Sequence, residues 1–170
     1  MLFFNAPLDY KPNTDALSFI SNEINPLLLR NNFLNYRILL CGRRLPASFN
    51  DLKNYADKNI IYAGFVNDVI PYFKASDICI NPVITGGGVK TKIVEAMGYG
   101  ITVISSITGA AGIEFSVCGE KIKTVPDNNA EAFATAIIQT KNVIEPTPNS
   151  YYNYYYWGNI IKKIQPFFKD

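Results

Sequence analysis

Short apolar runs alternate along the chain with longer segments whose apolar residues recur at helical spacing. Six of these runs have the length of a buried strand, and they cover residues 2–6, 36–41, 59–63, 77–82, 101–105 and 121–125. Apolar strands separated by helices are typical of a parallel sheet that is covered on both faces. The pattern therefore predicts an α/β fold with a doubly wound, mainly parallel six-stranded sheet and helices on both faces.

The segment between the first two strands predicts a helix that is capped by Asn13 or Thr14. Pro26 lies within this segment and is expected either to bend the helix or to restart it. The apolar residues that share one side of the helix are Leu17, Ile20, Ile24 and Leu28. This helix would form a crossover connection between parallel strands.

Three further helices are expected, over residues 68–75, 89–99 and 129–141. Gly100 would end the second of them in a left-handed conformation. Asn128 and Glu131 have the spacing of a capping pair at the start of the third.

A polar stretch with two prolines at residues 145–150 predicts a linker. We therefore expect a main domain over residues 1–145, followed by a linker and an aromatic C-terminal helix over residues 146–170. The sequence YYNYYYWGNIIKKIQPFF has low intrinsic helix propensity, so this helix needs a surface to dock on. Packing on the main domain is favoured over a role as a surface for a partner.

The composition narrows the possible chemistry. The chain has 16 Lys and Arg against 14 Asp and Glu, a formal charge of only +2, which argues against nucleic acid as a partner. It has no histidine, which excludes Ser-His-Asp and Cys-His catalysis and every zinc site that contains histidine. Any chemistry must therefore use carboxylates, lysines, hydroxyls or backbone amides.

The three cysteines, Cys41, Cys79 and Cys118, are about 40 residues apart and match neither a metal-binding knuckle nor a disulfide framework. We interpret them as buried apolar residues in a reducing compartment, and we expect no metal site. No apolar run is long enough to span a membrane, and the first residues lack the signature of a signal peptide. The expected location is the cytoplasm.

The segment ICINPVITGGGVKTKIVEAMGYGITVISS reads as a strand, a glycine-rich loop, a helix and another strand. Glycines allow the backbone to approach an anion, and free amides at a helix start favour negative charge. The loop would consist of Gly86, Gly87 and Gly88, and the amides would come from Gly88, Val89, Lys90 and Thr91. The segment is neither a P-loop, which needs Gly before Lys90, nor a dinucleotide fingerprint, which needs Gly at position 91.

Helical spacing places Gly88, Lys92 and Glu95 on one face of this helix. The Glu95 carboxylate is then well placed to accept hydrogen bonds from the ribose of a ligand whose phosphates lie at the helix start. The alternative interpretation is a surface ion pair between Lys92 and Glu95, which would contribute only about 0.2–0.5 kcal/mol.

Several segments together resemble the C-terminal, donor-binding domain of retaining GT-B glycosyltransferases of the group 1, or family 4, type. They are FFNAPLDYKPNTDAL, ILLCGRR, IIYAGFVNDVIPYFKASDICINPV, GGGVKTKIVEAMGYGITVISSITGAAGIEF and YYW. The resemblance implies one Rossmann-like half of a GT-B fold. It also implies transfer of a sugar, with retention, from a UDP-type or GDP-type nucleotide sugar to a glycan or lipid-linked acceptor, with no further cofactor.

The resemblance also implies roles for individual residues. Glu95 would bind the donor ribose, and the backbone at Phe65 and Val66 would contact the nucleobase. Residues 86–91 and Lys92 would hold the diphosphate. Arg43 and Arg44 follow a strand and would reach the phosphates from the carboxyl edge of the sheet, unless they are ordinary solvated surface.

The chain departs from the family pattern at three points. Many members have a glutamate near the reacting sugar where this chain has Gly87, so no catalytic residue is assigned. Members often have an Arg and a Lys after the first strand that clamp the diphosphate, whereas Lys11 is the sole nearby cation here and would take that role. The N-terminal acceptor domain of the family is absent, so we expect either an excised piece of a larger enzyme or a shortened gene product.

These departures leave other functions open. On its own, the chain is expected to bind the donor weakly and to transfer little or no sugar. A complete enzyme could still associate peripherally with a membrane. The main alternative is a degenerate, non-catalytic scaffold domain. An epimerase of the same fold would be expected to use paired carboxylate and histidine chemistry, and a receiver-like regulatory domain would need more acidic residues than Asp9 after the first strand.

Overall fold

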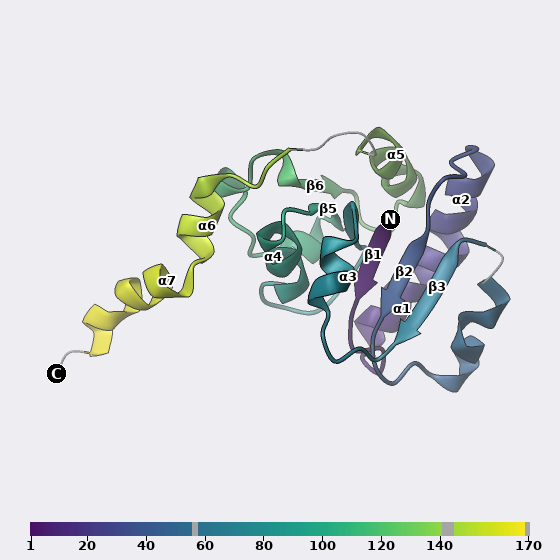
Figure 1. Ribbon diagram of the computed structural model, residues 1–170, viewed down its shortest axis with the longest axis horizontal. Helices are drawn as coiled ribbons and strands as arrows, with labels where there is room; N and C mark the ends of the chain where they lie inside the picture. Colours follow the sequence, from purple (N-terminus) through teal and green to yellow (C-terminus); the bar gives the residue numbers. More distant parts are fainter. Residues whose placement is uncertain (56–57, 141–144, 169–170) are drawn as a thin grey trace.

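The computed structural model describes residues 1–55, 58–140 and 145–168. Its centre is one sheet of six strands, all parallel, in the order β3-β2-β1-β4-β5-β6 (Figure 1). The strands are β1 (Leu2–Asn5), β2 (Ile38–Cys41), β3 (Ile60–Gly64), β4 (Ile78–Asn81), β5 (Thr102–Ser106) and β6 (Ile122–Val125). All six strands were predicted from the apolar runs, which confirms the doubly wound α/β fold.

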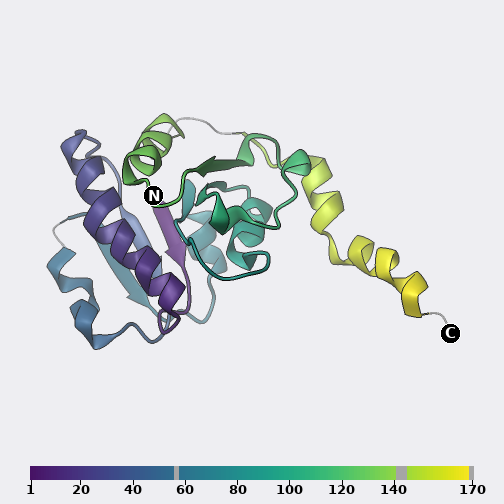
Figure 2. The same ribbon diagram turned by 180° about the vertical axis from the view of Figure 1, so that it is seen from behind.

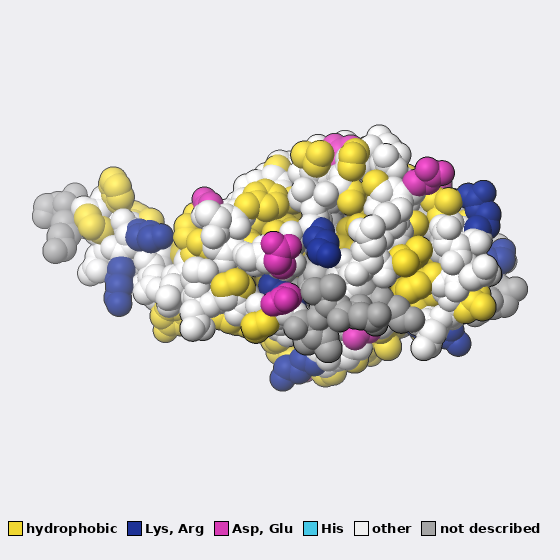
Figure 3. Space-filling view, turned by 90° about the horizontal axis from the view of Figure 1, so that it is seen from above, with side chains coloured by type: hydrophobic (Ala, Val, Ile, Leu, Met, Phe, Trp, Pro, Cys, Tyr) yellow, Lys and Arg dark blue, Asp and Glu magenta, His cyan; other side chains and the backbone are white. Residues whose placement is uncertain are grey.

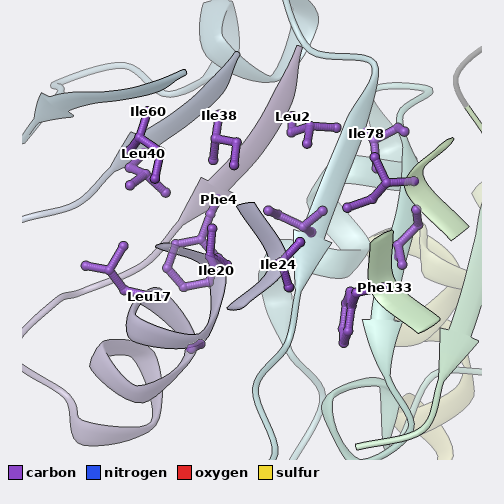
Figure 4. Close-up of a cluster of buried hydrophobic side chains, with 14 of the residues drawn as sticks. Leu2, Phe4, Leu17, Ile20, Ile24, Ile38, Leu40, Ile60, Ile78 and Phe133 are labelled. Atoms are coloured by element: carbon purple, nitrogen blue, oxygen red, sulfur yellow. The ribbon is translucent and has the colours of Figure 1, made fainter. Parts of the chain in front are cut away.

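Helices cover both faces of the sheet (Figures 1 and 2). One face carries α1 (Lys11–Phe19), α2 (Asn25–Arg30) and α5 (Ala130–Thr140), and the other carries α3 (Ile70–Lys74), α4 (Thr91–Gly98) and α6 (Asn149–Tyr155). Successive residues of β1 alternate between the two cores, since Leu2 and Phe4 belong to the cluster that includes Leu17 of α1 (Figure 4), whereas Phe3 packs with Phe73 of α3. Cys41, Cys79 and Cys118 are buried and free, which confirms their interpretation as buried residues.

The first helix starts earlier than predicted. It begins at Lys11, with Pro12 in its first turn and no side-chain cap, so the expectation of a cap by Asn13 or Thr14 is wrong. The chain continues through a π-helical segment, Ile20–Ile24, into α2, where Pro26 lies in the first turn. Pro26 therefore restarts the helix, because its missing N–H is tolerated there.

The other helices also differ at their starts. Asn129, not Asn128, caps α5: its side-chain oxygen accepts from the Ala132 amide at 2.9 Å. Asn128 has a φ of 54° and belongs to the preceding turn. Helix α4 begins at Thr91 and not at residue 89. Position 141, the predicted end of the helix after β6, lies outside the described residues. The segment Ala47–Tyr55, with 3₁₀ turns interrupted by left-handed backbone angles at residues 50–52, was not predicted.

The aromatic segment forms two helices, whereas the sequence predicted one. The chain breaks at Tyr156, which has extended backbone angles, into α6 and α7 (Trp157–Ile164), with a 3₁₀ turn at Gln165–Phe168. Tyr151 of α6 is 2% exposed, and its hydroxyl donates to the Val94 carbonyl at 2.5 Å. Helix α7 has no buried residue and projects from the body (Figures 1 and 3). Only the first half of the segment therefore packs as expected.

Helix α7 carries its apolar side chains along one side. Trp157 is 73% exposed and Phe167, in the turn that follows, is 85% exposed. Figure 3 shows this arm with hydrophobic and basic side chains side by side. Among the described residues, no helix is both long enough and apolar enough to cross a membrane.

Candidate functional site

The centre of the sheet has a switch in direction between β1 and β4. These two strands are neighbours, but the chain leaves β1 for α1 on one face and leaves β4 for α4 on the other. Ligands of open α/β sheets bind in the crevice at the carboxyl ends of the strands at such a point. All the site residues predicted from the sequence lie in loops at this edge, or in α1 and α4, which start there.

The glycine-rich loop after β4 is folded around a lysine. Gly86 and Gly88 have φ angles of 89° and 74°, which favour glycine. The Lys90 ammonium donates to the Gly86 carbonyl at 2.8 Å and to the Gly87 and Gly88 carbonyls at 3.2 Å. A β-carbon on Gly86 would lie 3.1 Å from the Tyr10 hydroxyl, so the loop passes close to the start of α1. Lys90 therefore organises the loop.

Lys92 reaches from α4 into the crevice. Its ammonium lies 3.4 Å from Asn13 Oδ1 in α1 and 4.5 Å from the centre of the Phe4 ring in β1. Burial lowers the pKa of Lys92 to about 8, and the positive charge of the neighbouring Lys90 adds to the shift. No ion pair joins Lys92 to Glu95, so the interpretation of these residues as a surface pair is wrong. Gly88 precedes the helix, so only Lys92 and Glu95 of the predicted face lie on α4.

Glu95 is a carboxylate without a hydrogen-bonding or ion-pair partner among the residues that the structure describes. The residue is exposed, yet partial desolvation raises the pKa of its carboxyl group above the ordinary value. It lies one turn after Lys92 on α4. Such a group can accept hydrogen bonds from the hydroxyls of a ligand whose anionic part lies near Lys92.

A hollow of about 310 Å³ lies beside the crevice, at the carboxyl ends of β1, β2 and β3. The predicted residues Arg43, Phe65 and Val66 all line it, together with Asn5, Ala6, Pro7, Gly42, Asn67 and Val69. A β-carbon on Gly42 would come 2.0 Å from the Ala6 carbonyl oxygen, so glycine is required where these two strand ends approach. The hollow has room for a flat ring with polar edges.

Two of the predicted cations are held by nearby carboxylates. Arg44 pairs with Asp9 at 2.6 Å, which lowers the pKa of the Asp9 carboxyl group. Lys11 pairs with Asp15, one turn along α1, at 2.7 Å. Both pairs are exposed, so they are screened by solvent and exchange readily. Arg43 and Lys92 have no ion-pair partner among the described residues.

Sequence reasoning missed two contributors to the site. Asn13, expected as a helix cap, contacts Lys92, and nothing in the local sequence indicates a contact over 79 positions. Gly109 lies in the turn after β5, where a β-carbon would come within 2.7 Å of Ser106 Oγ, Asn81 Nδ2 and the Val83 carbonyl. The TGAAG sequence around Gly109 is the only local feature that could have indicated this tight turn. In the described part of the chain, no cluster of three or more cysteine or acidic residues could hold a metal ion.

Solved structures with this fold are larger than the chain. A glycosyltransferase from Rickettsia africae superposes with a TM-score of 0.76 at 18% identity, over 98% of this chain and 46% of that one. The pneumococcal O-GlcNAc transferase GtfA, in complex with UDP and GlcNAc, has a TM-score of 0.69 at 13% identity, over 98% and 34%. HepE from Anabaena, in complex with UDP, has a TM-score of 0.57 at 15% identity, over 89% and 42%.

The chain thus spans less than half the length of each of these three structures, and at such identities the likeness shows the fold alone: a Rossmann-like half of the GT-B type. No curated protein sequence matches the chain. Residues 1–142 match the family described as glycosyl transferases group 1, which confirms the resemblance found in the motifs. Because this match covers most of the chain, the protein belongs to the glycosyl transferases group 1 family.

Proposed function

We propose that the chain binds the nucleotide-sugar donor of a retaining glycosyltransferase, with a UDP-type donor favoured over a GDP-type one. The observation that carries the proposal is the unpaired Glu95 carboxylate, which lies one turn from Lys92 at the switch point of the sheet. The uridine nucleotides bound to GtfA and HepE support the choice of base. No cofactor beyond the nucleotide sugar is proposed.

Each part of such a donor has a suitable surface. The ribose hydroxyls would donate to Glu95, and the diphosphate would lie against Lys92, the glycine-loop amides and the first turn of α4. The base would enter the hollow lined by Arg43, Phe65 and Val66. Arg44 and Lys11 would move from their carboxylates to the phosphates in a closed complex.

The catalytic contribution of this half would be electrostatic. When the bond between sugar and diphosphate breaks, negative charge accumulates on the departing diphosphate, and preorganised amides and ammonium groups stabilise it. The acceptor, a glycan or a lipid-linked sugar, would be held by a second domain. The chain alone would therefore bind donor but transfer little or no sugar.

Calorimetric titration with UDP, GDP and ADP tests the proposal. We expect UDP to bind most tightly and Glu95→Gln to weaken its binding by about tenfold, because a hydrogen bond to a charged acceptor is worth about 1.5–3 kcal/mol. Glu120→Gln, at the opposite edge of the sheet, is the matched control and should bind like the wild type. Equal affinities for Glu95→Gln and Glu120→Gln would contradict the ribose role.

A second candidate function is a non-catalytic scaffold that uses the family fold to hold a partner protein. The exposed apolar side chains of α7 and the absence of a carboxylate at Gly87 favour it. Absence of binding of all three nucleotides at millimolar concentration would favour the scaffold over the donor-binding function.

A further inference from the structure

The side-chain amide of Asn13 contacts both the loop after β1 and helix α4. Its Nδ2 donates to the Pro7 carbonyl at 2.8 Å, in the loop after β1, and its Oδ1 faces the Lys92 ammonium at 3.4 Å. The residue is 8% exposed. A carbonyl can only accept and an ammonium can only donate, so both neighbours require the same orientation of the amide. Asn13 is therefore held with its oxygen toward Lys92.

Lys92 is a partly buried cation whose two contacting groups are neutral. Its contacts are the Asn13 oxygen and the face of the Phe4 ring. The ion pairs of the described residues lie elsewhere, at Met1 with Asp77, Lys11 with Asp15, and Arg44 with Asp9. A desolvated charge without a counter-ion costs stability. Its position at the carboxyl edge of the sheet indicates a site that is completed by an anionic ligand.

We propose that Asn13 is a positioning residue that holds the Lys92 ammonium uncompensated in the crevice, so that the donor diphosphate supplies its counter-charge. This inference rests on the proposed function. Asn13 does not touch the reacting atoms, and it acts through the orientation and the free charge of Lys92. The neutral amide is essential, since an aspartate of the same shape would form an ion pair and occupy the cation.

None of the other charged or titratable groups near Lys92 supplies a counter-charge for its ammonium. Lys90, two residues earlier, repels the ammonium and is itself held by the glycine-loop carbonyls. The Cys79 thiol of β4 has its pKa raised to about 12 by burial, so it is neutral at physiological pH. Glu95 is on the same helix but forms no ion pair with Lys92.

The test compares Asn13→Asp with Asn35→Asp, which makes the same charge change in the exposed segment before β2. Calorimetry measures the affinity for UDP and for uridine, which lacks the phosphates, and NMR follows the titration of the Lys92 side chain. We expect Asn13→Asp to weaken UDP by at least about tenfold and to leave uridine unchanged, because the new carboxylate competes with the diphosphate. The titration of Lys92 should move above pH 8. Asn35→Asp should resemble the wild type.

The outcomes separate this inference from the proposed function. Equal UDP affinities for the two variants would overturn the role of Asn13 even though the donor binds. If neither UDP nor uridine binds the wild type, the proposed function fails, and inorganic pyrophosphate then decides the inference. Perturbation of the Lys92 resonances by pyrophosphate in the wild type but not in Asn13→Asp supports the anion site, and no perturbation in either overturns it. Thermal unfolding of each variant establishes that it is folded.

Discussion

Gly109 lies against Asn81 so closely that a β-carbon on Gly109 would come 2.6 Å from the Asn81 side-chain nitrogen. That nitrogen donates to Ser105 Oγ at 3.0 Å and to the Gly109 carbonyl at 3.3 Å, in a buried polar cluster at the carboxyl ends of β4 and β5. The cluster joins the turn after β5 to the strand end from which the glycine-rich loop starts. The TGAAG turn is therefore part of the support of the proposed donor site.

Gly109→Ala should destabilise the protein by about 1–3 kcal/mol, because the methyl group has no space in this packed cluster. Gly98→Ala is the control, since a β-carbon there meets nothing within 4 Å and the residue ends a helix. It should leave stability unchanged or raise it by about 0.4–1 kcal/mol. Urea denaturation measures both, and equal stabilities would contradict the close packing at Gly109.

Tyr151→Phe tests how α6 is attached. Tyr151 is 2% exposed, and its hydroxyl donates to the Val94 carbonyl of α4. Loss of this hydrogen bond should lower the free energy of unfolding by about 0.5–1.5 kcal/mol. Tyr156→Phe, at a 65% exposed position, should have no effect on the free energy of unfolding.

Limited proteolysis should cut the C-terminal segment faster in Tyr151→Ala than in the wild type, and equal rates would show that α6 is held by other contacts.

The four central strands, β2, β1, β4 and β5, could be predicted from the sequence because each is a mainly apolar run that is buried along nearly its whole length. The edge strands β3 and β6 are partly exposed and were predicted from shorter apolar runs. The helix starts could not be predicted reliably, since they depend on neighbouring loops. Helix α1 begins at Lys11, with Pro12 in its first turn, before either polar capping candidate. Helix α4 begins only at Thr91, because Lys90 still has extended backbone angles. The break at Tyr156 was missed because the residues on either side have similar helix propensity and only α6 finds a surface to pack on.

The candidate site also has parts that could be predicted from the local sequence and parts that could not. Glu95 and the glycine-rich loop were found because their chemistry lies within one local segment. The contact of Asn13 with Lys92 was missed because it joins two helices on opposite faces of the sheet, and only the strand order brings their starts together. The pairing of Arg44 with Asp9 depends likewise on the neighbouring ends of β1 and β2.

Lys92→Met should change the pH dependence of stability. The pKa of Lys92 is about 8 in the folded protein and near 10.5 in the unfolded chain, so the unfolded state binds more protons between these values. The Lys92 contribution to stability therefore rises as the pH increases from about 8 to 10.5. Lys92→Met should be more stable than the wild type at pH 7, on the order of 1–3 kcal/mol, and this difference should shrink by pH 10. Urea denaturation at the two pH values measures it, and a constant difference would contradict the buried ammonium.

The pH dependence of donor binding tests Glu95 from the opposite direction. Desolvation raises the pKa of the Glu95 carboxyl group, whereas hydrogen bonds from ribose hydroxyls stabilise its charged form, so binding should lower that pKa again. The affinity should therefore be constant at neutral pH and fall as the pH drops through the raised pKa of the free protein. UDP-glucose is the suitable probe, because its diphosphate lacks the terminal phosphate that titrates near pH 6. In Glu95→Gln the affinity should be lower at pH 7 and lose this dependence, whereas Glu120→Gln should keep the wild-type profile. A profile in Glu95→Gln that still falls like that of the wild type would show that another group controls donor binding.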